Sequence, residues 1–187
     1  MIKLRNISKS FNDKSIISNL NLEIKYGEKI AIMGKSGTGK TTLLNIIMGL
    51  VSPDSGTISG VPKSKSMVFQ ENRLLDDFSA YDNIKLVCNT DKEKILQHFE
   101  ELGLSGEEDK LAGEYSGGMK RRLAIMRAVL AEPELIVMDE AFKGLDKVTK
   151  NIVIDYVFKY TQNKTCVFVT HDKSEAISLQ CNRIIEI

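Results

Sequence analysis

The feature that most constrains the fold is a glycine-rich stretch at residues 34–41, which reads GKSGTGKT and matches the pattern G-x-x-x-x-G-K-[ST]. It follows the apolar run IAIM, which is typical of a strand. It precedes KTTLLNIIMGL, whose apolar residues cover most faces of a predicted buried helix. Strand, glycine loop and helix therefore follow one another as the pattern requires, which disfavours a chance glycine-rich turn.

This loop predicts phosphate binding. Glycines let successive backbone N–H groups curl around phosphate oxygens, and the helix N-terminus adds partial positive charge. Lys40 can reach the β- and γ-phosphates, Thr41 can offer its hydroxyl to Mg²⁺, and Thr42 supports phosphate binding. The loop alone leaves ATP and GTP open. The predicted residues are Gly34, Lys35, Ser36, Gly37, Thr38, Gly39, Lys40, Thr41 and Thr42.

A second candidate feature is a pair of carboxylates after the apolar run LIVM at residues 135–138. Ligand sites of open parallel sheets lie at the carboxyl ends of the strands. Asp139 suits a water-mediated Mg²⁺ ligand, and Glu140 suits a base that orients or deprotonates the attacking water. Such a pair alone is equally typical of a solvated loop, but beside a complete phosphate loop it indicates hydrolysis. Lys40 and Glu140 are expected to matter most.

The remaining pattern predicts one α/β domain of 187 residues with an antiparallel β piece at the front and a helical insertion in the middle. Apolar runs separated by helical stretches after residue 133 indicate parallel strands with crossover helices. Strands are expected at 1–8, 15–24, 28–33, 65–69, 135–138, 166–169 and 184–187, helices at 40–50, 91–102, 119–131 and 147–160, and turns or loops at 11–14, 51–60 and 71–83.

Charge and cysteine content narrow the class of partner. Twenty-six basic and 25 acidic residues give a net charge of +1, too little for a general attraction to nucleic acid. The three cysteines lack metal-ligand spacing, which favours buried thiols in a reducing compartment. The sequence shows neither a signal peptide nor the roughly 20 apolar residues of a membrane span. We therefore expect a cytoplasmic protein whose membrane role requires a partner.

Ser116-Gly117-Gly118 resembles the signature motif of the ABC ATPases and lies about twenty residues before the carboxylate strand, as in that family. The resemblance covers nearly the whole chain. It implies a P-loop NTPase core with a mainly parallel sheet, an N-terminal antiparallel β subdomain and a helical subdomain insertion. It divides a single domain at 1–187 into a β subdomain and RecA-like core, about 1–70 and 132–187, and a helical subdomain, about 71–131.

The resemblance also implies roles for residues outside the phosphate loop. Phe11, 29 residues before Lys40, would stack on adenine, and Gln70 would sense Mg²⁺ and the attacking water. His171 would hydrogen-bond the γ-phosphate. The signature residues Ser116, Gly117 and Gly118 would contact the γ-phosphate of the opposite subunit, and Asp146 would link the two sites. A spare anion-binding helix end makes sense if it closes over nucleotide held by another copy.

The function that the resemblance implies is an ATPase subunit that binds ATP and Mg²⁺, pairs head to tail as a homodimer and drives a separate membrane permease. Such a subunit would lie on the inner face of the cell membrane and serve a system with a solute-binding protein. Residues 70–82 resemble importers of the nitrate, sulfonate and taurine type, and residues 73–84 are either a docking face for the permease or a plain surface loop.

Two rival functions remain at this point. A non-transport ABC ATPase acting on DNA or the ribosome usually carries a coiled-coil insertion or tandem cassettes, and only 46 positions separate Gln70 from Ser116. A module that binds ATP without hydrolysing it is disfavoured by intact Lys40, Asp139, Glu140 and His171. No nucleic-acid partner is expected.

Some residues depart from the family pattern or have simpler interpretations. Met119 replaces the usual glutamine of the signature, and Ala141 stands where proline is frequent. Lys143-Gly144 replaces a pair of small residues that is commoner in the family. Phe11 alone would be typical of a core aromatic, and His171 alone of a loop histidine. We expect His98 to be structural and the basic run at residues 120–122 to form a solvated rim.

Overall fold

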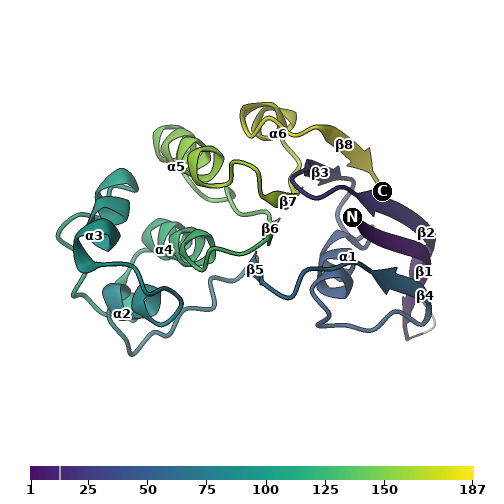
Figure 1. The fold of residues 1–187 in the computed structure, drawn as a ribbon, viewed down its shortest axis with the longest axis horizontal. Helices are drawn as coiled ribbons and strands as arrows, with labels where there is room; N and C mark the ends of the chain where they lie inside the picture. The colour runs from purple at the N-terminus through teal and green to yellow at the C-terminus, as the bar shows by residue number, and fades with distance from the viewer. Residues whose placement is uncertain (13) are drawn as a thin grey trace.

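The computed structural model describes residues 1–12 and 14–187. It forms a three-stranded and a five-stranded sheet with helices on both sides of the larger one (Figure 1). The elements follow one another as β1 (Ile2–Phe11), β2 (Lys14–Ile24), β3 (Lys29–Met33), α1 (Lys40–Ile47), β4 (Ser55–Ser59), β5 (Lys65–Val68), α2 (Ala80–Lys85), α3 (Lys92–Glu101), the 3₁₀ turn η1 (Ala112–Glu114), α4 (Gly117–Leu130), β6 (Leu135–Asp139), α5 (Lys147–Tyr160), β7 (Thr165–Val169), α6 (Lys173–Ser178) and β8 (Arg183–Glu186).

The larger sheet has the strand order β5-β6-β7-β3-β8, and every neighbouring pair is parallel. All five residues of β3, β6 and β7 are buried, as expected for parallel strands covered on both faces. Alternate residues therefore belong to two cores. Ile30, Val137 and Val167 pack toward α1 and the antiparallel sheet. Phe168 packs with α4 and α5 on the other face.

The smaller sheet is antiparallel and has the order β2-β1-β4. Ile2 lies opposite Ile24 and Leu4 opposite Leu22, so one apolar face of this sheet covers the core that contains α1. In Figure 1 these strands lie on the right beside both chain termini, whereas α2 and α3 lie on the far left. The parallel sheet and the β-rich front are as the sequence predicted. The turn expected at 11–14 includes residue 13, which lies outside the described residues.

Three short elements differ from the sequence prediction. Residues 51–60 were expected to be a turn, but β4 pairs there with β1, with Thr57 opposite Arg5. Strand pairing thus overrides the turn propensity of Ser55-Gly56-Thr57. The loop expected at 71–83 contains the start of α2, whose N-terminus is capped by Ser79 accepting from the N–H of Asp82. Helix α6 was not predicted, and Asp172 caps it by accepting from the N–H of Ser174.

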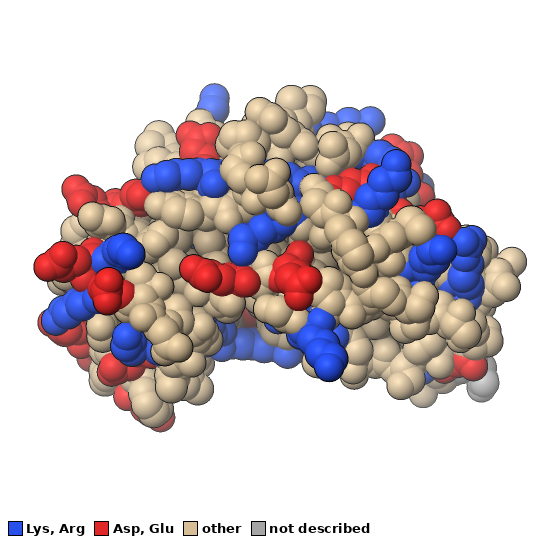
Figure 2. Space-filling view, viewed as in Figure 1, with Lys and Arg blue, Asp and Glu red and all other residues tan. Residues whose placement is uncertain are grey.

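The surface in Figure 2 carries basic and acidic side chains interspersed rather than separated into fields of one sign. Arg5 and Glu23 form one exposed ion pair of opposite charges on the surface. Among the helices of residues 1–12 and 14–187, none has the length and apolar character needed to cross a bilayer.

Candidate active site

The glycine loop turns from β3 into α1 as the sequence predicts. Gly37 and Gly39 have φ angles of 84° and 93°, in the region that favours glycine. A Cβ at Gly39 would lie 2.9 Å from Cγ2 of Ile16, so this position also lacks space for a side chain. Lys40 is buried, and its Nζ donates to the carbonyl oxygens of Gly34 at 2.8 Å and Lys35 at 2.6 Å. The loop thus holds the ammonium group inside its own curve.

The three predicted metal residues meet beside this loop. The Thr41 hydroxyl donates to Oδ2 of Asp139 at 2.7 Å, and Nε2 of Gln70 lies 3.4 Å from the Thr41 oxygen. Asp139 is 1% exposed, and its Oδ1 has no hydrogen-bond partner in the described residues. Burial raises the pKa of this carboxyl, the nearby charge of Glu140 adds to the increase, and the Thr41 hydrogen bond opposes it.

This donor set fits Mg²⁺. A buried carboxylate oxygen without a partner carries a large desolvation cost, which a cation would offset. The carboxylate, hydroxyl and amide oxygens are hard ligands of the kind that Mg²⁺ binds together with phosphate oxygens and water. Within the part of the chain that the structure describes, no cluster of three His, Cys, Asp or Glu residues forms a cage for a metal on its own. A phosphate-bearing ligand would therefore complete the shell.

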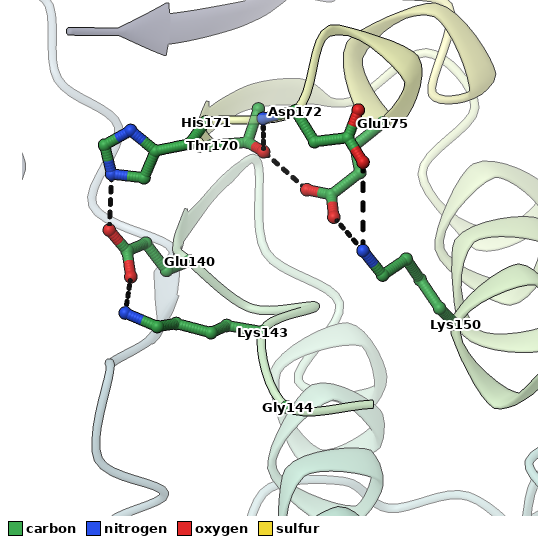
Figure 3. Close-up of a pocket in the computed structure, with 8 residues that line it drawn as sticks. All are labelled: Glu140, Lys143, Gly144, Lys150, Thr170, His171, Asp172 and Glu175. Atoms are coloured by element: carbon green, nitrogen blue, oxygen red, sulfur yellow. Dashed lines mark hydrogen bonds and ion pairs between the residues drawn. The ribbon is translucent and has the colours of Figure 1, made fainter. Parts of the chain in front are cut away.

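Glu140 directly follows β6 and lies between two basic side chains (Figure 3). Its Oε1 is 2.9 Å from Nε2 of His171, and its Oε2 accepts from Nζ of Lys143 at 2.8 Å. The Lys143 hydrogen bond lowers the pKa of Glu140, burial opposes this, and His171 adds to the lowering. The carboxylate is thus ionised at neutral pH, as a base must be.

The backbone of Glu140 is also constrained. Its φ of 47° lies in the left-handed region, which is uncommon for residues other than glycine. The Glu140 N–H donates to the carbonyl oxygen of Val169 at 3.0 Å, which ties the end of β6 to the end of β7. This turn sets the direction in which the side chain leaves the sheet. Such conformations persist where surrounding structure enforces them and are common at functional sites.

A cavity of about 350 Å³ brings the glycine loop together with the more distant predicted residues. Phe11 is 48% exposed at this cavity, so the interpretation as a core aromatic is wrong. Nζ of Lys9 lies over the Phe11 ring, 5.2 Å from its centre, in a cation–π contact. The lining residues are Phe11, Ile16, Ser36, Gly37, Gly39, Lys40, Thr41, Thr42, Gln70 and Glu140.

The signature residues lie elsewhere. Ser116 caps α4 by accepting from the N–H of Met119 at 3.3 Å, and Ser116 and Gly117 are exposed. Ser116, Gly117 and Gly118 are absent from the described residues that line the Lys40 cavity. Asp146 caps α5 by accepting from two backbone N–H groups. One chain therefore presents two separate helix N-termini suited to anions, at α1 and α4.

Sequence reasoning missed the role of Arg121. The residue was expected in a solvated rim, but it is 9% exposed and donates to the backbone carbonyl oxygens of Phe69 and Gln70. The prediction was wrong because α4 turns this side chain inward, on the face that carries Ile125 and Ala128. The i, i+4, i+7 spacing was the available signal. Arg121 thus fastens the segment around Gln70 to the helix that begins at the signature.

His98 lies away from this site, as expected. It is buried on α3, and its Nδ1 lies 3.0 Å from the hydroxyl of Tyr156. The pKa of His98 is lowered, chiefly by burial. The charge of Glu101 opposes this decrease, and the charge of Lys159 adds to it. A neutral imidazole thus joins α3 to α5.

Fold and site together define a P-loop nucleotide hydrolase, because a glycine loop, a Mg²⁺-type carboxylate and a candidate base meet at one edge of a parallel sheet. A family model described as ABC transporter matches residues 17–143. The chain belongs to this family, and as a member it binds and hydrolyses ATP with Mg²⁺.

Several curated proteins are similar over almost the whole chain. The aliphatic sulfonates import ATP-binding protein SsuB 1 of Agrobacterium fabrum is 36% identical over 98% of this chain and 69% of its own length. The corresponding protein of Pseudomonas syringae pv. tomato is 38% identical over 98% of this chain and 69% of its own length. The intermembrane phospholipid transport system ATP-binding protein MlaF of Haemophilus influenzae is 34% identical over 96% of this chain and 77% of its own length.

Solved structures agree with this grouping. A dimeric structure of a post-hydrolysis state of the ATP-binding cassette MJ0796, bound to ADP and Pi, superposes with a TM-score of 0.87. It is 29% identical, and the match covers 100% of this chain and 94% of the other. A second dimeric structure of that bacterial ABC transporter cassette gives a TM-score of 0.87 at 30% identity with the same coverage. The P-loop NTPase fold expected from the sequence is thus confirmed.

Proposed function

We propose that the ends of three neighbouring strands act together on one Mg-ATP to drive transport through a separate membrane permease. The supporting observation is that β6, β7 and β3 are adjacent and parallel. Lys40 and Thr41 follow β3, Asp139 ends β6 and Glu140 follows it, and His171 follows β7. The unpaired Oδ1 of Asp139, beside the Thr41 hydroxyl, carries the proposal because it fits a metal on the phosphates.

Each side chain then has a role at a stated atom. Lys40 leaves the carbonyls of Gly34 and Lys35 to bind the β- and γ-phosphates. Glu140 accepts a proton from, or orients, the attacking water, a contribution of about 10² to 10⁴-fold. His171, whose Nε2 is hydrogen-bonded to Glu140 in this structure, turns from that carboxylate to donate to the γ-phosphate. Thr41, Asp139 and Gln70 would hold Mg²⁺, which would neutralise part of the charge that develops on the phosphates. Phe11 stacks on adenine.

A second copy of the chain completes the site. The α4 N-terminus, with Ser116, Gly117 and Gly118, presents its N–H groups outside the Lys40 cavity of its own chain. The proposed closure is head to tail, so that these groups bind the γ-phosphate of the partner, while Asp146 links the two sites. The similar MJ0796 cassette forms a dimer in its structure with ADP and Pi, which supports this arrangement. Two nucleotides would lie between two chains.

The proposed partners are integral-membrane permease subunits, with the chain on the cytoplasmic face of the membrane. The similarity to the sulfonate import proteins supports a transporter of the nitrate, sulfonate and taurine type that also uses a solute-binding protein. Within residues 73–84, Leu75 is 44% and Phe78 47% exposed, which suits an apolar docking face. We place this face in a helical subdomain of about 71–131, inserted in a core of about 1–70 and 132–187.

The hydrolysis roles are tested by Mg-ATP turnover of the wild type beside Glu140→Gln. We expect the variant to retain ATP affinity, to lose at least about 100-fold in turnover and to form an ATP-dependent dimer detectable by size-exclusion chromatography. Equal turnover of the two proteins would refute the assignment of Glu140. ATP binding with no turnover by the wild type would favour the non-hydrolysing interaction module.

The transport role is tested by identifying what co-purifies with the chain from its native membrane. We expect a permease with the wild type and with Leu50→Asp, an exposed control outside the docking face, but not with Phe78→Asp. Recovery of ribosomes or DNA without a permease would favour the non-transport alternative. Equal permease recovery with all three proteins would refute the docking face and keep the ATPase assignment.

A further inference from the structure

Both carboxylate oxygens of Glu140 are already engaged. His171 occupies Oε1 at 2.9 Å, and Lys143 occupies Oε2 at 2.8 Å. A base that orients water needs a free acceptor position within hydrogen-bond reach of that water. A carboxylate has about four such positions, and these two side chains fill two of them. His171 leaves Oε1 when it turns to the γ-phosphate as proposed above, whereas Lys143 still occupies Oε2, so the attacking water reaches the carboxylate most freely once Lys143 also withdraws.

Lys143 is well placed to withdraw. Its side chain is 77% exposed, compared with 48% for His171 and 12% for Glu140. It reaches Glu140 across a single turn, where the Lys143 N–H also donates to the Glu140 carbonyl oxygen at 3.1 Å. Glu140 is the only carboxylate within ion-pair distance of Lys143 in residues 1–12 and 14–187. Breaking this pair leaves a solvated lysine, at little cost.

The surrounding space permits the movement. Glu140, Lys143, Gly144 and His171 line a cavity of about 340 Å³, separate from the one lined by the glycine loop (Figure 3). Gly144 follows with a φ of 82°, so the backbone after Lys143 uses a conformation that favours glycine. Glu140 lines both cavities, whereas Lys143 lines only the one without glycine-loop residues.

We propose that Lys143 is a latch that occupies Oε2 of Glu140 in the resting chain and restrains hydrolysis until the lysine moves away into solvent. The proposal rests on the proposed role of Glu140 as base. Lys143 is thus a positioning residue that acts through Glu140 and does not touch the nucleotide. It makes the resting subunit slower than its site would otherwise be, which suits an ATPase that must wait for its transport partner.

The test compares Lys143→Met and Lys143→Arg with the wild type and with Lys63→Met, an exposed control away from the site. We expect Lys143→Met to raise kcat by about two- to fivefold, the range that an exposed ion pair supports. The Kd for ATP should stay unchanged. Lys143→Arg, which retains the positive charge, and Lys63→Met should behave as the wild type does. Because Lys143 is exposed, none of these changes should unfold the chain.

Salt provides a second readout that a merely structural role would not move. At about 0.5 M KCl an exposed pair is strongly screened, so the wild type and Lys143→Met should converge in kcat. Unchanged or lower kcat in Lys143→Met, or an advantage that persists in high salt, would overturn the latch. Failure of the proposed function would give a different result, because the wild type would then show no Mg-ATP turnover, or the same turnover as Glu140→Gln.

Discussion

Replacing Arg121 tests whether α4 holds the segment around Gln70. Arg121→Met keeps an unbranched, largely apolar side chain but removes both donors to the carbonyl oxygens of Phe69 and Gln70. Each charge-assisted hydrogen bond contributes about 1.5–3 kcal/mol. The buried guanidinium also has a desolvation cost, which lowers its pKa and which methionine relieves. The expected net loss in the free energy of unfolding is about 2–4 kcal/mol.

Urea unfolding measures this loss. For a domain of this size, a loss of about 3 kcal/mol should lower the melting temperature by about 6–12 °C. Arg121→Lys should recover part of the loss, because one ammonium cannot reproduce the fork that serves two carbonyls. Arg5→Met is the matched control, since Arg5 is 53% exposed and pairs on the surface with Glu23, and it should cost less than about 1 kcal/mol.

The same variant separates structure from function. Nε2 of Gln70 lies 3.4 Å from Oγ1 of Thr41, beside the proposed metal site. Loosening the Gln70 backbone should therefore lower turnover at saturating Mg-ATP more than it lowers ATP affinity. A change in unfolding free energy below about 0.5 kcal/mol would refute the argument from the buried hydrogen bonds. A destabilised Arg121→Met with full turnover would refute its role in placing Gln70 while leaving the packing argument intact.

Two further predictions concern buried titratable groups. Asp139→Asn should leave the unfolding free energy unchanged or higher, because burial raises the pKa of Asp139 and makes its charged form costly. The same change should abolish the Mg²⁺-dependent increase in ATP affinity measured by calorimetry, and a retained Mg²⁺ effect would contradict the metal assignment. Since burial lowers the pKa of His98, the unfolded chain binds an extra proton below about pH 6.5. Urea unfolding of the wild type should therefore show stability falling between pH 7.5 and 5.5 more steeply than in His98→Asn, and equal slopes would exclude His98 as the cause.

Much of the nucleotide site could be predicted from the sequence because its parts are local. The glycine loop from Gly34 to Thr41 carries its own donors, and its strand and helix are adjacent in the chain. Asp139 and Glu140 end an apolar run, and parallel strands place such ends at one edge of a sheet. Phe11, Gln70 and His171 required family resemblance, because nothing local joins them to the loop.

The α/β fold class, the phosphate loop and the carboxylate pair could all be inferred from the order of residues alone. The order β6-β7-β3 that unites them, the strand at β4 and the burial of Arg121 became evident only in the folded chain. The sharing of one carboxylate by Lys143 and His171 also belongs to this second group. The difference between the two groups is one of range. Loop chemistry and periodicity act between neighbours in the chain, whereas strand order, burial and ion pairs depend on distant segments that meet only when the core forms.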